Sequence, residues 1–141
     1  RGGDQALNTS TPMYPLPQHF HLEQEQLQAA GVKEWGSLAR LQDGALRQLA
    51  RQGASEQRLT RLRGQARLME ALALEAGDAA LLLHAGIATA TALAECSPER
   101  LQVQLTRLER ALRPGALARI DRDTVRGWIL RARKASSRSP N

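Results

Sequence analysis

The sequence predicts an all-α protein, and three observations carry that prediction. Hydrophobic residues make up 42% of the 141 residues but aromatic residues only 3%, so Leu and Ala supply most of the burial, which favours helices. Strand-like runs of Val, Ile, Thr and Tyr are missing. Apolar residues also recur at helical spacing, as in the series Leu59, Leu62, Ala66 and Met69.

The two ends of the chain differ in composition from its middle. Residues 1–20 contain Gly, Asn, Ser, Thr and three prolines without helical periodicity, which predicts a flexible, Pro-rich leader whose later part is an extended segment. Residues 136–141 predict a polar tail. Between them we expect two helical units, residues 21–73 and residues 74–135.

An internal repeat defines these two units. A single constant shift along the chain aligns LQAAGVKEWGSLARLQDGAL with LLHAGIATATALAECSPERL. The matched pairs are apolar anchors and one glycine: Leu27 with Leu82, Ala30 with Ala85, Gly31 with Gly86, Val32 with Ile87, Leu38 with Leu93, Ala39 with Ala94, and Leu46 with Leu101. Because the polar positions between them differ freely, the pattern indicates a duplicated unit with a common structural core.

Each unit begins with two short helices. The first helix ends at Gly31 or Gly86, where we expect the left-handed conformation that glycine adopts with little strain. Val32 or Ile87 then packs back against that helix. Thr89 is the expected N-cap of the second short helix, which buries its apolar side.

Two further helices complete each unit. Ser97-Pro98-Glu99 predicts a helix start in the second unit, and Asp43 is expected to cap the corresponding helix of the first. Longer helices then begin at Ser55 and at Asp121. A short insertion precedes the second of these, around Pro114, and we predict that it forms a loop.

The charge balance points to a polyanionic partner. With 20 Lys and Arg against 14 Asp and Glu, the net charge is +6, which suits nucleic acid, an acidic protein or an anionic membrane surface. Arg outnumbers Lys, since only Lys33 and Lys134 are lysines. Arg binds phosphate and carboxylate in a bidentate manner, although a GC-rich genome would give the same bias.

The cellular location is expected to be the cytoplasm. Cys96 is the single cysteine, so an internal disulfide is excluded and a reducing compartment fits. No apolar run approaches the roughly 18 residues that a membrane span needs, and no signal peptide is visible.

The run Leu81-Leu82-Leu83-His84-Ala85-Gly86-Ile87, followed by Leu93-Ala94 and later by Trp128-Ile129, resembles an uncharacterised family found mainly in cyanobacteria, domain of unknown function 4332. The resemblance extends from about residue 22 to residue 134. It implies tandem helix-hairpin-helix-like (SAM-like) units, packed as one compact helical domain. It implies no activity.

That resemblance offers a test of phosphate binding. Helix-hairpin-helix modules hold phosphate with a Gly-hydrophobic-Gly turn at a helix N-terminus. The matching residues 74–78 contain one glycine and two acids, and the matching residues 19–23 contain no glycine. The usual phosphate-binding turn is therefore not expected in either unit.

Catalytic and metal chemistry find little support. His19 and His21 lie close to Glu23 and Glu25, but a zinc site needs further ligands placed by the fold. His84 is expected to bond a late helix carbonyl, where the helix dipole favours its protonated form. No catalytic or nucleotide-binding motif occurs, so we expect no enzyme activity, no cofactor and no metal.

Basic residues on the two closing helices are the candidate binding site. We predict that they form a phosphate-binding surface made of Arg58, Arg61, Arg63, Arg67, Arg126, Arg131, Arg133 and Lys134. Trp35 and Trp128 fall on apolar stripes and are expected in the core. We favour a sequence-nonspecific nucleic-acid binder; the alternative is a protein-interaction adaptor with an acidic partner.

Overall fold

The computed structural model describes residues 11–115 and 120–138, and these residues are mostly helical. In chain order the elements are η1 (Gln18–Phe20), α2 (His21–Ala29), α3 (Trp35–Ala39), α4 (Asp43–Arg51), α5 (Glu56–Leu72), α6 (Ala76–His84), α7 (Ala90–Ala94), α8 (Pro98–Leu112) and α9 (Arg122–Arg138). The described residues contain one isolated β-bridge, between Pro12 and Glu34, and no longer strand. The all-α prediction is confirmed.

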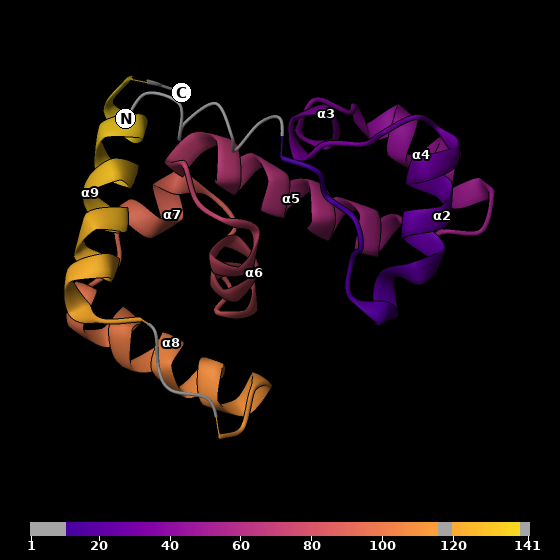
Figure 1. The fold of residues 1–141 in the computed structure, drawn as a ribbon. Helices are drawn as coiled ribbons and strands as arrows, with labels where there is room; N and C mark the ends of the chain where they lie inside the picture. The colour runs from indigo at the N-terminus through magenta and orange to yellow at the C-terminus, as the bar shows by residue number, and fades with distance from the viewer. Residues whose placement is uncertain (1–10, 116–119, 139–141) are drawn as a thin grey trace.

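Helix α5 runs through the middle of the molecule (Figure 1). Helices α3 and α4 pack against it from the first half of the chain, and α6, α7 and α9 contact it from the second half. Helices α7 and α8 in turn pack against α9. The buried apolar residues of both halves form one continuous core.

The helix bounds follow the repeat found in the sequence. The shift that pairs Leu27 with Leu82 also carries both ends of α2 onto those of α6, and both ends of α3 onto those of α7. Helix α9 matches α5 in length but lies further along the chain than this shift predicts. We predicted that the whole insertion forms a loop. Helix α8 has 15 residues and the equivalent α4 has nine, so part of the insertion instead lengthens α8. The rest lies in the connection 113–121.

The turns after α2 and α6 have the same geometry. Gly31 and Gly86 have φ values of 83° and 87°, as predicted. The next residue of each turn donates its backbone N–H back into the helix at 2.9 Å, from Val32 to Leu27 O and from Ile87 to Leu82 O. This hydrogen bond satisfies a carbonyl that the helix end leaves free.

Four helices in the described part of the chain begin with a side-chain cap. Oxygens of Ser55, Thr89, Ser97 and Asp121 each accept the backbone N–H three residues later. The prediction for Asp43 is wrong: the N-cap of α4 is Gln42, whose side chain makes no capping bond. The Asp43 carboxylate instead forms an ion pair with Arg63.

Residues 11–20, predicted as part of a flexible leader, pack on the first unit. Met13, Leu16 and Phe20 are buried in the core, and Met13 donates its backbone N–H to Lys33 O at 3.3 Å. The Pro-rich segment was predicted to be extended, but its packing was not predicted, because the prolines remove the helical periodicity that would reveal buried apolar side chains. Residues 1–10 lie outside the described residues, as do 139–141 of the predicted tail, while residues 136–138 continue α9.

Candidate nucleic-acid interface

The predicted basic residues occupy α5 and α9, but they do not form one surface. Five of them donate to backbone carbonyls of other elements: Arg58, Arg63, Arg67, Arg131 and Arg133. Arg61, Arg126 and Lys134 are exposed and make no such bond within the described part of the chain. Most of the predicted arginines therefore use part of the guanidinium to hold neighbouring elements together.

One of these structural contacts occurs at the same place in both units. Arg67 donates Nε–H to Ala39 O at 3.2 Å, and Arg133 donates Nε–H to Ala94 O, also at 3.2 Å. The two carbonyls belong to the last residues of α3 and α7, where helix carbonyls lack intrahelical partners. A cation also interacts favourably with the negative end of a helix dipole.

Arg63 and Arg131 make contacts that have no counterpart in the other unit. Arg63 is buried, donates to Leu41 O at 2.9 Å and forms an ion pair with Asp43 at 2.7 Å. Arg131 donates to Leu72 O at 2.9 Å and so links α9 to the end of α5.

The remaining predicted cations of α9 are Arg126 and Lys134, and only Arg126 forms an ion pair with a described residue. Arg126 lies 3.9 Å from a carboxylate oxygen of Glu99, which partly neutralises it. Lys134 is exposed and makes no ion pair with a described residue.

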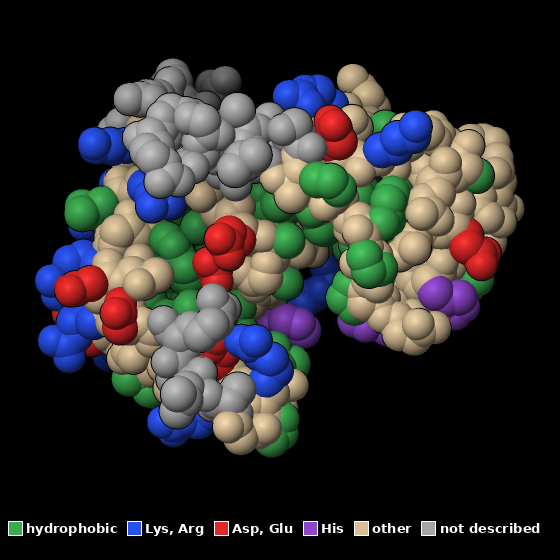
Figure 2. Space-filling view, in the orientation of Figure 1, with side chains coloured by type: hydrophobic (Ala, Val, Ile, Leu, Met, Phe, Trp, Pro, Cys, Tyr) green, Lys and Arg blue, Asp and Glu red, His purple; other side chains and the backbone are tan. Residues whose placement is uncertain are grey.

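A hollow between the two units, beside α5, brings Arg58 and Arg61 together with His19 and His84, and we call it the basic cleft. Arg58 donates to His19 O at 3.4 Å, and a terminal nitrogen of Arg61 lies 3.4 Å from Nδ1 of His84. Figure 2 shows His side chains on both sides of this hollow, with basic side chains near its back. Within the described part of the chain, neither arginine forms an ion pair.

The electrostatics of His84 reverse our expectation for this residue. Partial burial lowers its pKa, and the positive charges of Arg61 and His19 lower the pKa further. The helix dipole was expected to favour the protonated form, but neighbouring cations and desolvation outweigh it. The lowered pKa favours the neutral imidazole, whose Nδ1 can accept a hydrogen bond from Arg61.

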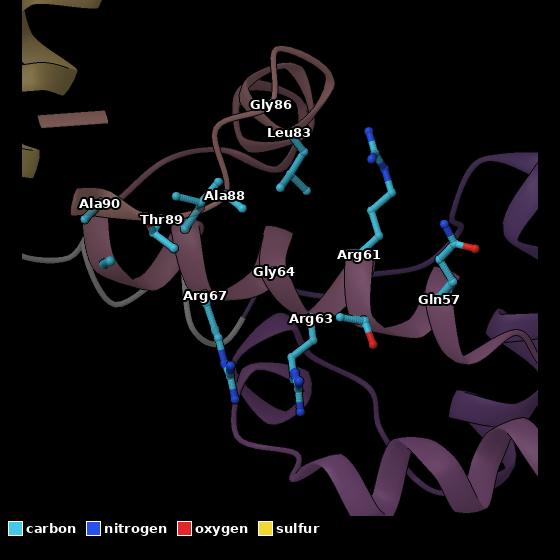
Figure 3. A pocket seen from close by; sticks show the side chains of 13 residues that line it. Gln57, Arg61, Arg63, Gly64, Arg67, Leu83, Gly86, Ala88, Thr89 and Ala90 are labelled. Carbon is cyan, nitrogen blue, oxygen red and sulfur yellow. The ribbon is translucent and has the colours of Figure 1, made fainter. Parts of the chain in front are cut away.

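The arginines of α5 point to two sides of that helix (Figure 3). Arg61 extends away from Arg63 and Arg67, which reach toward α3 and α4. Two arginines outside the predicted set, Arg40 and Arg47, lie on this second side. The repeat did not draw attention to them, because the equivalent positions of the second unit are Glu95 and Gln102 and not arginines.

Other features bear on what the surface can do. Trp35 and Trp128 are buried, as predicted, so they offer no stacking platform. Burial and the charge of Glu95 raise the pKa of the Cys96 thiol, which makes it a poor nucleophile. The described residues contain no group of three or more side chains suited to a metal. Nor does any helix among them combine the length and apolar character that crossing a membrane requires.

Comparison with protein families identifies the chain. A family model described as Domain of unknown function (DUF4332) matches residues 17–135, so the chain belongs to this family. The match covers both units and begins within the packed extended segment. Comparisons with curated proteins and with solved structures give no match.

Proposed function

We propose that this member of the DUF4332 family is a non-catalytic binding module that contacts the phosphate backbone of nucleic acids. The observation that carries the proposal is the basic cleft between the two units. Arg58 and Arg61 line it without an ion pair to a described residue, and the carbonyl of His19 and the imidazole of His84 contact them.

The chemistry of the cleft suits phosphate rather than bases. A guanidinium that keeps free N–H groups can bind two phosphate oxygens, and such contacts fix a strand without reading its sequence. Both tryptophans are buried, so base stacking on them does not contribute. We therefore expect affinity that depends strongly on salt and weakly on sequence.

The predicted relation to helix-hairpin-helix modules also remains a proposal. It is supported by the equal helix offsets and by the left-handed glycines that follow α2 and α6. The phosphate contact proposed here does not use the usual hairpin turn, since Glu75 and Asp78 lie at the start of α6. Binding by the side chains of α5 replaces it.

Fluorescence anisotropy with short single- and double-stranded oligonucleotides tests the proposal. The double variant Arg58→Ala/Arg61→Ala removes both guanidiniums from the cleft. We expect the slope of log affinity against log salt to fall by roughly 1.4 to 1.8, which corresponds to two lost phosphate contacts.

A second double variant provides the matched control. Arg100→Ala/Arg110→Ala also removes two positive charges, but from exposed positions on α8. It should leave the slope close to that of the wild-type protein. Equal losses in both double variants, or no binding near physiological salt, would rule out the cleft as the phosphate site.

A specific feature favours the alternative, an adaptor that binds an acidic protein. A groove of about 520 Å³ runs between α5 and the segment that joins α6 to α7 (Figure 3). Gly64, Leu83 and Ala88 line it, and Arg61 lies at one end. An acidic amphipathic peptide would place its apolar side chains in the groove and a carboxylate beside Arg61. Ala88→Phe should abolish such binding and leave oligonucleotide affinity within about twofold, because it fills the groove without changing its charge.

A further inference from the structure

A polar hollow of about 520 Å³ lies where α3, α4 and α5 meet, on the side of α5 that faces away from Arg61. Its lining residues are Arg40, Leu41, Gln42, Asp43, Gly44, Arg47, Arg63 and Arg67. Arginines thus reach it from three parts of the first unit. We propose that this hollow is a separate binding site for a phosphate group.

The charges around the hollow do not cancel. Asp43 forms an ion pair with Arg63 at 2.7 Å, and Glu70 forms one with Arg40 at 3.1 Å. Arg47 and Arg67 form no ion pair with a described residue. Arg67 uses its Nε–H for Ala39 O, which leaves its two terminal nitrogens free to donate. A net positive charge therefore remains.

The positive charges of several guanidiniums converge where the Asp43 carboxylate lies. The hydrogen bond and charge of Arg63 lower the pKa of Asp43, and the charges of Arg47 and Arg67 lower it further. Asp43 occupies a position that favours an anion, and its side chain is 71% exposed. It can turn outward without crossing the core, so an arriving oxyanion can take its place beside Arg63.

Part of the site is fixed before a ligand arrives. The Arg63 side chain is 9% exposed and is held by Leu41 O at 2.9 Å, and Arg67 is held by Ala39 O at 3.2 Å. Ordering long side chains opposes binding, so arginines already anchored by the fold lose less entropy when they bind a ligand. Arg47 is exposed and free to close over the bound group.

The shared fold does not require these arginines. The second unit keeps Arg133 in place of Arg67, with the same carbonyl contact. It differs at the other equivalent positions, where it has Glu95, Pro98, Gln102 and Ile129 in place of Arg40, Asp43, Arg47 and Arg63. The arginine cluster is therefore an addition to the common unit, which points to a role in binding.

Phosphate is the anion that this arrangement suits best. Guanidinium groups bind phosphate oxygens in bidentate pairs, and a phosphate monoester carries more than one negative charge at pH 7. The lining is polar, so an apolar ligand has no surface to cover. The site rests on its own residues, none of which belongs to the basic cleft.

The direct test is a titration of the full chain with inorganic phosphate, followed by ¹H–¹⁵N NMR including the arginine Nε–H signals. Chloride at matched ionic strength serves as the reference. We expect saturable shifts at Arg47 and Arg67. Arg47→Gln should raise the Kd about tenfold, because it removes one charged hydrogen-bond donor. Arg51→Gln, on the same helix but outside the hollow, should change it less than about twofold.

A second variant should increase phosphate affinity, so its effect cannot be explained by loss of the fold. Asp43→Asn removes the competing negative charge but keeps the size of the side chain, so it should tighten phosphate binding. Shifts that do not saturate would overturn the proposal. So would equal effects of Arg47→Gln and Arg51→Gln, or an Asp43→Asn variant that folds normally and does not bind phosphate more tightly.

Two further arms identify the source of the phosphate. One compares an oligonucleotide carrying a 5′-phosphate with the same oligonucleotide ending in a hydroxyl, and the other uses a sugar phosphate alone. Preference for the 5′-phosphate that Arg47→Gln abolishes assigns the site to a nucleic-acid end. Equal binding of the sugar phosphate assigns it to a small ligand. Arg58→Ala/Arg61→Ala should leave inorganic phosphate binding unchanged, which separates this site from the basic cleft.

Discussion

The first unit, α2 to α5, and the second unit, α6 to α9, place the same backbone devices at equivalent positions. In both, a left-handed glycine ends the opening helix and the following apolar residue bonds back into it. In both, an arginine of the closing helix donates to the end of the short helix. These contacts determine the path of the chain, and they are the ones that the two units share.

The units differ where the third helix of each begins. Helix α8 starts with the Ser97 cap and Pro98, and Glu99 follows. Helix α4 starts at Gln42 without a side-chain cap, beside the arginine-lined hollow. Positions that fix the backbone thus stay alike, while positions that set the local charge diverge. In our proposal, the first unit binds phosphate at the position where the second unit has a helix cap.

The largest expected effect tests whether the units share one core. Leu27 and Leu82 are equivalent and completely buried. Leu27→Ala and Leu82→Ala should each lower the free energy of unfolding by about 3 kcal/mol, through lost burial and a residual cavity. Urea denaturation followed by circular dichroism should show a single transition in each variant. Two separate transitions would mean that the units unfold independently.

A smaller effect is expected at the two left-handed glycines. An added Cβ would meet no atom within 4 Å at Gly31 or Gly86, so the penalty comes from the backbone conformation alone. Gly31→Ala and Gly86→Ala should each cost about 1–2 kcal/mol. Gly77→Ala, also in open space but inside α6, is the control and should not destabilise the protein. Unequal losses at the two turns would break the equivalence of the units.

The shared arginine contact should contribute less, because both side chains are exposed. Arg67→Met and Arg133→Met each remove one hydrogen bond to a helix-end carbonyl. Each should lower stability by about 0.5–1 kcal/mol, measured by thermal unfolding. Arg107→Met, exposed on α8, removes a charge without such a bond. If Arg107→Met lowered stability as much as the other two variants, the effect would come from net charge and not from the hydrogen bond.

The smallest effect concerns the caps of α5 and α9, which differ in chemistry. The backbone hydrogen bond from Thr124 lowers the pKa of Asp121, whereas Ser55 does not titrate. The Asp121 cap therefore contributes fully above the ordinary Asp range and is lost as the pH falls through the lowered pKa. The Thr124 amide signal should move in an acid titration while that of Arg58 does not. Asp121→Asn should abolish the shift at Thr124.

Local sequence signals predicted most of the helix boundaries correctly. The glycine turns and the caps at Ser55, Thr89 and Ser97 depend on residues within one or two helical turns, so the sequence reveals them directly. Asp43 looked like one more local cap, but Arg63, which lies on the next helix, binds its carboxylate. A local sequence pattern does not show that an arginine from another helix will bind the carboxylate in place of the α4 backbone.

The candidate site was less predictable for the same reason. Helical spacing placed the arginines of α5 in one surface, whereas Arg61 points away from Arg63 and Arg67, and Arg67 reaches Ala39 O. Buried Glu23 illustrates the point: its carboxylate accepts the backbone N–H of Ser55 at 2.7 Å, although the two residues are far apart in the sequence. Such contacts arise only when distant helices are brought together.

Helix α5 carries the basic cleft on one side and the arginine-lined hollow on the other. A helix with its side chains is about 10–12 Å across, so this width fixes the separation of the two proposed sites. A ligand with one phosphate can occupy either site but not both. A ligand long enough to pass around α5 makes its second contact intramolecularly, at a high effective concentration. Chain length would then select ligands through avidity, even where base sequence does not.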